Sequence, residues 1–198
     1  MPNAVTPAAP AEIIPSPKMP EAVVRQHLSE AIHACWKTQY RLIRLKQMPP
    51  TEARKHWDNG PESNWFFTYS EDKVNKLLHI FQNVARILAS PQLKIVCKDD
   101  FPYYGMAIPY LHYLHIKLGI AWANGSDYEK TQTLIHEASH VANRTVLDEN
   151  RWYGPEKARR MARWSYRRPR RSTRSADNLG YYAMDCLIGG TAGIFAAA

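Results

Sequence analysis

The sequence predicts an α+β domain in which helices outnumber strands. Along several long segments, apolar residues recur at steps of three and four, as on the buried face of an amphipathic helix. Two short segments are instead rich in β-forming residues and are bounded by turn residues. No internal repeat is visible. No apolar run reaches the eighteen or so residues that a membrane span needs, so no membrane span is expected.

The chain divides into a short leader and one domain. Residues 1–20 hold six of the fourteen prolines together with several alanines, a composition that favours an extended, disordered segment. Residues 21–198 are then expected to form a single domain, because a chain of this length suffices for one sizeable core.

The predicted elements are helices, then a small sheet, then helices again. A long helix runs from Pro20 to the Pro49-Pro50 pair, which ends it. The other expected elements are a short helix from Thr51, a helix capped by Ser70, strands over Leu93–Cys97 and Tyr110–Ala121, and helices over Thr131–Asn143, Glu156–Trp164 and from Ser175 onward.

Cysteine usage and charge add two expectations. Cys35, Cys97 and Cys186 are widely spaced and odd in number, which favours buried free thiols over disulfides. The formal net charge is +8, and nine of the 26 Lys and Arg residues fall within Lys157–Arg174. That segment is either a solvated helix face followed by a basic loop, or a contact for nucleic acid, an anionic membrane or an acidic protein.

The segment His136-Glu137-Ala138-Ser139-His140 carries the strongest chemical signal. Two histidines four residues apart project from one face of a helix and can bind a single Zn²⁺. The metal lowers the pKa of a water molecule, and Glu137 can accept the proton as a general base. The motif therefore predicts zinc-dependent hydrolysis of peptide bonds.

The third zinc ligand is not fixed by the motif. A metzincin needs Gly and His at the positions that hold Asn143 and Val146, so that class is excluded. A thermolysin-like site needs a Glu on a later helix. The nearest candidates, Glu149 and Glu156, follow the motif too soon in the sequence to match that site. The remaining carboxylates are Asp148, Glu149 and Asp177.

Three segments in order, TLIHEASH, TVLDENRWYG and SADNLGYYA, resemble the aspzincins, the group of deuterolysin and peptidyl-lysine metalloendopeptidase. The resemblance covers about a third of the chain. It implies a zincin-like fold, one zinc ion bound by His136, His140 and Asp148, and a protein or peptide substrate. Glu137 would be the base, and Tyr153 would donate a hydrogen bond to the forming oxyanion.

The resemblance leaves two points open. The family spaces its Asp and Tyr three residues apart, whereas Asp148 and Tyr153 are five apart, so Glu149 remains a rival ligand. Lysine-specific members line their substrate pocket with an Asp and a Glu three residues later. Asp177 matches the first as a substrate-binding residue, but Gly180 stands at the second, so a basic side chain is expected to be preferred only weakly. Asp177 could also cap its helix or reach the zinc.

The predicted function is thus a zinc endopeptidase. The alternative is a zinc-containing binding protein that uses residues 157–174 on nucleic acid or anionic surfaces. The absence of a convincing fourth ligand disfavours a structural zinc. Nucleic acid is therefore not the expected partner under the main prediction. The N-terminus lacks a basic region followed by an apolar one, so no secretory signal is expected. The proline-rich leader is compatible with an exported effector or toxin that has an immunity or secretion partner, and a cytoplasmic protein is the other option.

Overall fold

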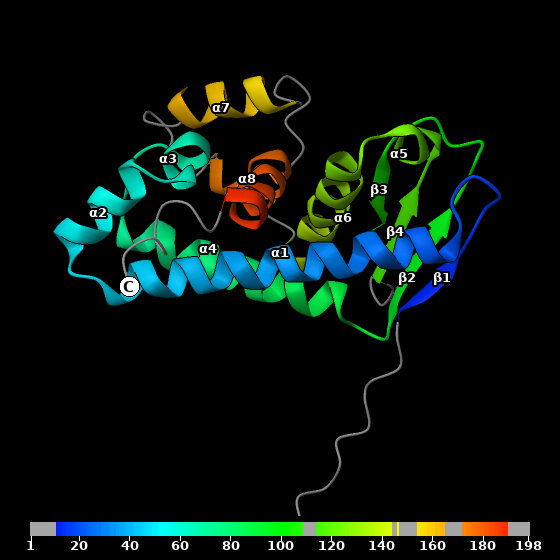
Figure 1. The fold of residues 1–198 in the computed structure, drawn as a ribbon, viewed down its shortest axis with the longest axis horizontal. Helices are drawn as coiled ribbons and strands as arrows, with labels where there is room; N and C mark the ends of the chain where they lie inside the picture. Colours follow the sequence, from blue (N-terminus) through cyan, green and yellow to red (C-terminus); the bar gives the residue numbers. More distant parts are fainter. Residues whose placement is uncertain (1–10, 109–113, 144–145, 147–153, 165–171, 190–198) are drawn as a thin grey trace, which may run out of the picture.

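A computed structural model describes residues 11–108, 114–143, 146, 154–164 and 172–189. A small mixed sheet lies beside a larger group of helices, and the long helix α1 runs along both (Figure 1). The elements are β1 (Glu12–Ile14), α1 (Glu21–Gln47), α2 (Pro50–Asp58), α3 (Pro61–Phe66), α4 (Glu71–Leu88), β2 (Leu93–Cys97), β3 (Gly105–Ile108), β4 (Leu114–Leu118), α5 (Ile120–Asn124), α6 (Asp127–Ala142), α7 (Pro155–Trp164), the 3₁₀ turn η1 (Ser172–Arg174) and α8 (Ala176–Gly189).

The four described strands have the order β1-β2-β4-β3. The pairs β1–β2 and β2–β4 are parallel, and β3 is antiparallel to β4 with Ala107 opposite Ile116. Residues at alternate positions of β2 are buried, as expected for a strand with one face on a core. The strand β3 is therefore an edge strand, and it lies against α6.

The core lies where α1 packs on α4, α6 and α8. The helix α1 is long because its apolar residues recur on one face and because no proline interrupts it before Pro49. Trp57 and Trp65 are both almost fully buried in this core. The three cysteines are free and buried, which confirms that prediction.

A buried ion pair joins three helices of this core. The guanidinium of Arg41 in α1 pairs with the carboxylate of Glu62 in α3, and the hydroxyl of Tyr182 in α8 donates to the same carboxylate at 2.8 Å. Glu62 is completely buried. Removing one partner of such a pair would leave an uncompensated buried charge, which typically costs about 3–5 kcal/mol.

The structure corrects two expectations and adds one strand. Residues 12–14, assigned to the disordered leader, form β1 on the sheet, because Ile13 packs into the core and the backbone pairs with β2. The strand β3 was not predicted. The strand expected to reach Ala121 ends at Leu118, because Gly119 leads directly into α5.

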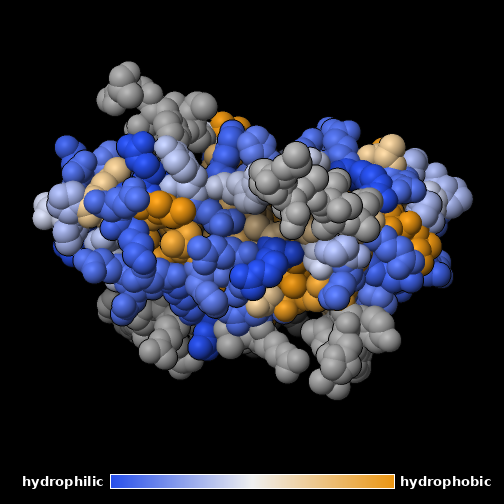
Figure 2. Space-filling model, turned by 90° about the horizontal axis from the view of Figure 1, so that it is seen from below, coloured by the Kyte–Doolittle hydropathy of each residue, from blue (hydrophilic) through white to orange (hydrophobic). Residues whose placement is uncertain are grey.

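On the face shown in Figure 2, hydrophilic residues dominate and apolar residues gather in separate small patches. Among the helices that the structure describes, none is both long enough and apolar enough to cross a bilayer.

Candidate metal centre

Helix α6 carries the two histidines of the motif, and its start is fixed by a capping box. The hydroxyl of Ser126 accepts a hydrogen bond from the N–H of Glu129, and the carboxylate of Glu129 accepts from the N–H and hydroxyl of Ser126. These bonds satisfy backbone donors that the first turn of a helix leaves free. The helix therefore begins at a defined residue, more than two turns before His136 and His140, which we call the metal pair.

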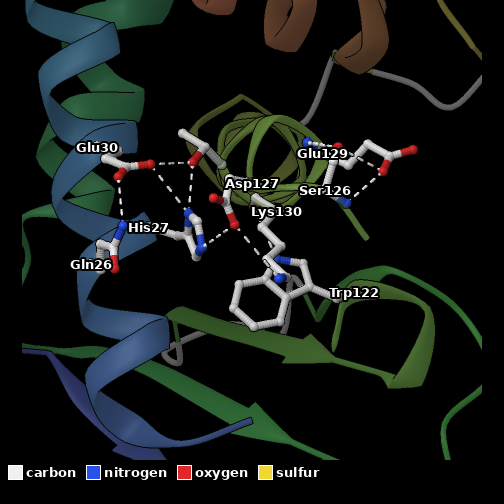
Figure 3. A network of polar contacts seen from close by, with 9 residues as sticks. Gln26, His27, Glu30, Trp122, Ser126, Asp127, Glu129 and Lys130 are labelled. Carbon is white, nitrogen blue, oxygen red and sulfur yellow. Dashed lines mark hydrogen bonds and ion pairs between the residues drawn. The ribbon is translucent and has the colours of Figure 1, made fainter. Parts of the chain in front are cut away.

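A polar network holds the same half of α6 against α1 (Figure 3). The buried ring of His27 lies with Nδ1 at 3.0 Å from the hydroxyl of Thr131 and Nε2 at 3.6 Å from Asp127. Thr131 also donates to Glu30 at 2.9 Å. The edge of the His27 ring faces Trp122, with the ring centroids 5.7 Å apart. These contacts lock α6 to α1 and so limit movement of the metal pair.

The rings of His136 and His140 meet edge to face across one helical turn, with their planes at 73°. Their Nε2 atoms are 3.3 Å apart and their ring centroids 5.0 Å apart. His136 is almost buried, with 7% of its surface exposed, whereas His140 is half-buried. The sequence therefore correctly predicted that α6 places both imidazoles on one side.

The Nδ1 atoms of the pair point away from each other and meet oxygen acceptors. Nδ1 of His136 lies 2.9 Å from a carboxylate oxygen of Asp177, and Nδ1 of His140 lies 3.3 Å from the carbonyl oxygen of Val146. A ring that donates through Nδ1 keeps its lone pair on Nε2. The two lone pairs therefore point toward the same region.

The pair fits a zinc ion. Two nitrogens each about 2.0–2.1 Å from one Zn²⁺ at a tetrahedral angle lie about 3.3–3.4 Å apart, which matches the 3.3 Å between the two Nε2 atoms. A cation between them would also relieve the repulsion of two facing lone pairs. Carboxylate and carbonyl acceptors on Nδ1 are the usual supports of zinc-binding histidines.

Glu137 lies against the edge strand β3. One carboxylate oxygen accepts a hydrogen bond from the N–H of Ala107 at 2.6 Å, and the residue is 7% exposed. A Cβ on Gly105 would come within 2.8 Å of Cγ and 2.9 Å of Oε1 of Glu137. Glycine at this position therefore allows β3 and the carboxylate to approach closely.

The other predicted site residues fall into two groups. Asp148, Tyr153 and the rival ligand Glu149 lie outside the described residues. Asp177, expected to bind substrate, is 8% exposed and has both oxygens engaged, one by His136 and the other by the N–H of Gly154 at 2.9 Å. Within the part of the chain that the structure describes, no three His, Cys, Asp or Glu side chains are arranged to hold a metal.

Two contributors to the site were missed from the sequence. Gly105 could have been suspected as a close approach, but only with β3 recognised as a strand beside α6. The carbonyl of Val146 gives no sequence signal, because any residue supplies a backbone oxygen.

Comparison with solved structures finds a fold that matches across most of the chain. A solved zinc peptidase from Grifola frondosa superposes with a TM-score of 0.60 at 18% sequence identity, over 84% of this chain and 96% of that one. At this identity the similarity establishes the fold. No family model and no curated protein sequence matches the chain.

Proposed function

We propose that the protein is a zinc-dependent endopeptidase whose metal is held by His136 and His140. The observation that carries the proposal is the pair of facing Nε2 atoms 3.3 Å apart, with each Nδ1 tied to an oxygen acceptor. The fold shared with a zinc peptidase supports the same conclusion.

The zinc ion, Glu137 and the N–H of Ala107 would have separate roles in peptide hydrolysis. When bound, Zn²⁺ would polarise the peptide carbonyl and make a water molecule more acidic. Glu137, next to His136 in the sequence and held beside β3, would serve as the general base for that water and as the proton donor to the leaving amine. The N–H of Ala107 keeps this carboxylate from rotating away.

Two further roles follow from the resemblance to the aspzincins. We assign Asp148 as the third zinc ligand, with Glu149 as the rival, and Tyr153 as the donor to the oxyanion. All three belong to the segment between α6 and α7, which begins and ends next to the metal pair: Val146 bonds to His140, and Gly154 bonds to Asp177.

Asp177 is proposed to position His136 rather than to bind substrate. Its two oxygens accept hydrogen bonds from His136 and Gly154, and the residue is 8% exposed, so the carboxylate is turned toward the protein rather than toward a substrate ammonium group. Gly180 offers no second carboxylate. The proposal therefore includes no preference for lysine at the cleavage site.

The edge strand β3 supports a peptide substrate. The N–H of Ala107 points to Glu137, and none of the described strands pairs with this side of β3, so this edge faces the site. An extended peptide can bind such an edge through main-chain hydrogen bonds without a specific side chain. This binding mode would bring the scissile bond alongside the metal and the base.

The change Glu137→Gln tests the proposal. It keeps the shape of the side chain but removes the base, so we expect zinc binding to persist and cleavage of an unfolded protein to fall about 10²–10⁴-fold. Glu129→Gln, two turns earlier on the same helix, is the matched control and should cleave like the parent. Equal rates for Glu137→Gln and the parent would rule out the mechanism.

A binding function is the second candidate, and the exposed face of α7 favours it. Lys157, Arg160 and Arg163 are exposed on α7, whereas Ala158, Met161 and Ala162 face the protein. Binding to a polyanion needs no general base, so a zinc-loaded parent that cleaves no protein would favour this candidate. A role as an exported effector remains a proposal from composition, to be checked by whether secretion or immunity genes lie beside this one.

A further inference from the structure

Helix α7 lies across α3 and α8 (Figure 1), and its contacts lead to the metal pair. Its buried residues Ala158, Met161 and Ala162 give it an apolar face, but ten residues bury little area. Two polar or aromatic contacts fix its position in addition, and we name them together the α7 seat. They are made by Asn178 and by Arg159.

Asn178 joins three helices at the centre of the α7 seat. It is fully buried in α8, and its amide nitrogen donates to the carbonyl of Ala158 in α7 at 3.0 Å and to the carbonyl of Trp65 in α3 at 2.7 Å. Both amide hydrogens are therefore used on backbone acceptors. The side chain next to Asp177 thus fixes the distance between α7 and α3.

Arg159 forms the outer part of the seat. Its guanidinium carbon lies 4.9 Å from the centroid of the Trp65 ring, within the range of a cation–π contact. Trp65 stacks on Tyr181 with centroids 5.2 Å apart and donates through Nε1 to Asp185 at 2.7 Å. Burial raises the pKa of Asp185, and the hydrogen bond from Trp65 and then the positive charge of Arg159 partly offset this effect.

Gly154, the residue before α7, connects this helix to the metal site. Gly154 has φ of 93°, which favours glycine, and its carbonyl accepts the hydrogen bond of Ala158 at the start of the helix. Its N–H donates to Asp177, whose other oxygen bonds to Nδ1 of His136. The position of α7 therefore decides where one of the two donors to Asp177 lies.

We propose that Asn178 and Arg159 are positioning residues of the metal site. They hold α7 so that the Gly154 N–H meets Asp177, and Asp177 in turn orients the ring of His136. This inference rests on the proposed function, since it concerns the affinity of the same two histidines for zinc.

The test measures the zinc dissociation constant at fixed pH by competition with a chromophoric chelator, together with the melting temperature of the metal-free protein. For Arg159→Ala and Gly154→Ala we expect the dissociation constant to rise about three- to tenfold, below the 10- to 100-fold typical when a direct support of a ligand is changed. Arg159→Lys, which keeps the charge but not the planar stack, should fall between the parent and Arg159→Ala. Asn178→Asp loses both amide donors, so its zinc dissociation constant should rise at least as much as that of Arg159→Ala.

Arg160→Ala is the matched control, because Arg160 is exposed on the same helix, and it should bind zinc like the parent. At Gly154, an added Cβ meets no atom of the described residues within 4 Å, so its effect is expected to come from the backbone conformation at φ 93°. If Arg159→Ala and Gly154→Ala bind zinc as tightly as the parent, the inference is overturned, even if their melting temperatures fall. Because Arg159 lies on the surface, its variant decides the matter should Asn178→Asp not fold. A parent protein that binds no zinc would instead overturn the proposed function, and this inference with it.

Discussion

Both histidines of the metal pair are oriented by a partner on Nδ1, but the two partners differ in kind. The partner of His140 is a backbone carbonyl, which no substitution removes, whereas the partner of His136 is the carboxylate of Asp177. A negative acceptor strengthens the imidazole as a ligand more than a neutral one does. The Asp177 side chain is therefore the most direct point at which the affinity of the site can be changed without touching a ligand.

We expect Asp177→Asn to weaken zinc binding about 10- to 100-fold. The amide keeps the shape of the side chain, but it can accept with only one of its two terminal atoms, so either His136 or Gly154 loses its acceptor. Chelator competition at fixed pH measures the effect. Asp99→Asn is a control at a carboxylate that accepts from Ser16 beside the sheet; if both variants lose affinity equally, Asp177 has no special role at the site.

At the residue scale, the sequence predicted the positions of candidate metal-binding side chains, but not the contacts of the residues that support them. The spacing of His136 and His140 determined their placement on one face of a helix, and the structure confirms it. Asp177 was singled out for another role, because its contact with His136 depends on how α8 packs against α6. Asn178 gave no signal, since a buried Asn looks like any polar residue until its backbone partners are known.

At the scale of the element, α6 depends on its anchored first half. The capping box at Ser126 and the network around His27 act on residues that precede the metal pair by about two turns (Figure 3). The hydrogen bonds from the Ser126 N–H and hydroxyl hold the pKa of Glu129 below its ordinary value. The start of α6 is therefore sensitive to acid.

The free energy of unfolding should fall as the pH drops below about 4.5, and Glu129→Gln should lessen this fall. The folded pKa of Glu129 is lowered, so its contribution is complete above the unfolded pKa and is lost as pH falls through the folded one. Glutamine keeps the capping geometry without the charge. Denaturant unfolding at a series of pH values between about 3 and 7 measures it. Identical pH profiles for the variant and the parent would contradict this account.

Elements with strong periodicity were predicted well, and weak ones were not. The helix α1 follows from its apolar pattern and from the prolines after it. The strands β1 and β3 have three and four residues, and each is held by its neighbour in the sheet rather than by its own sequence. Local patterns carry no information about such pairing partners.

At the scale of the whole molecule, the two histidines proposed to bind zinc, His136 and His140, lie where the sheet meets the helical group. Glu137 contacts β3, His136 contacts α8 through Asp177, and Gly154 connects the same carboxylate to α7. The α+β class followed from composition and periodicity. The way in which α7 and α8 meet at the site did not, because it depends on buried contacts between residues distant in sequence, such as Asn178 and Trp65.

The most direct test of the account is anomalous diffraction at the zinc absorption edge from crystals of the zinc-loaded protein. We predict one strong peak, about 2.0–2.1 Å from Nε2 of both His136 and His140, with a carboxylate of Asp148 completing the protein ligands. Coordination by Glu149 in its place would correct the ligand set but keep the site. The absence of a peak between the two histidines, or a zinc ion bound elsewhere on the chain, would contradict the central claim.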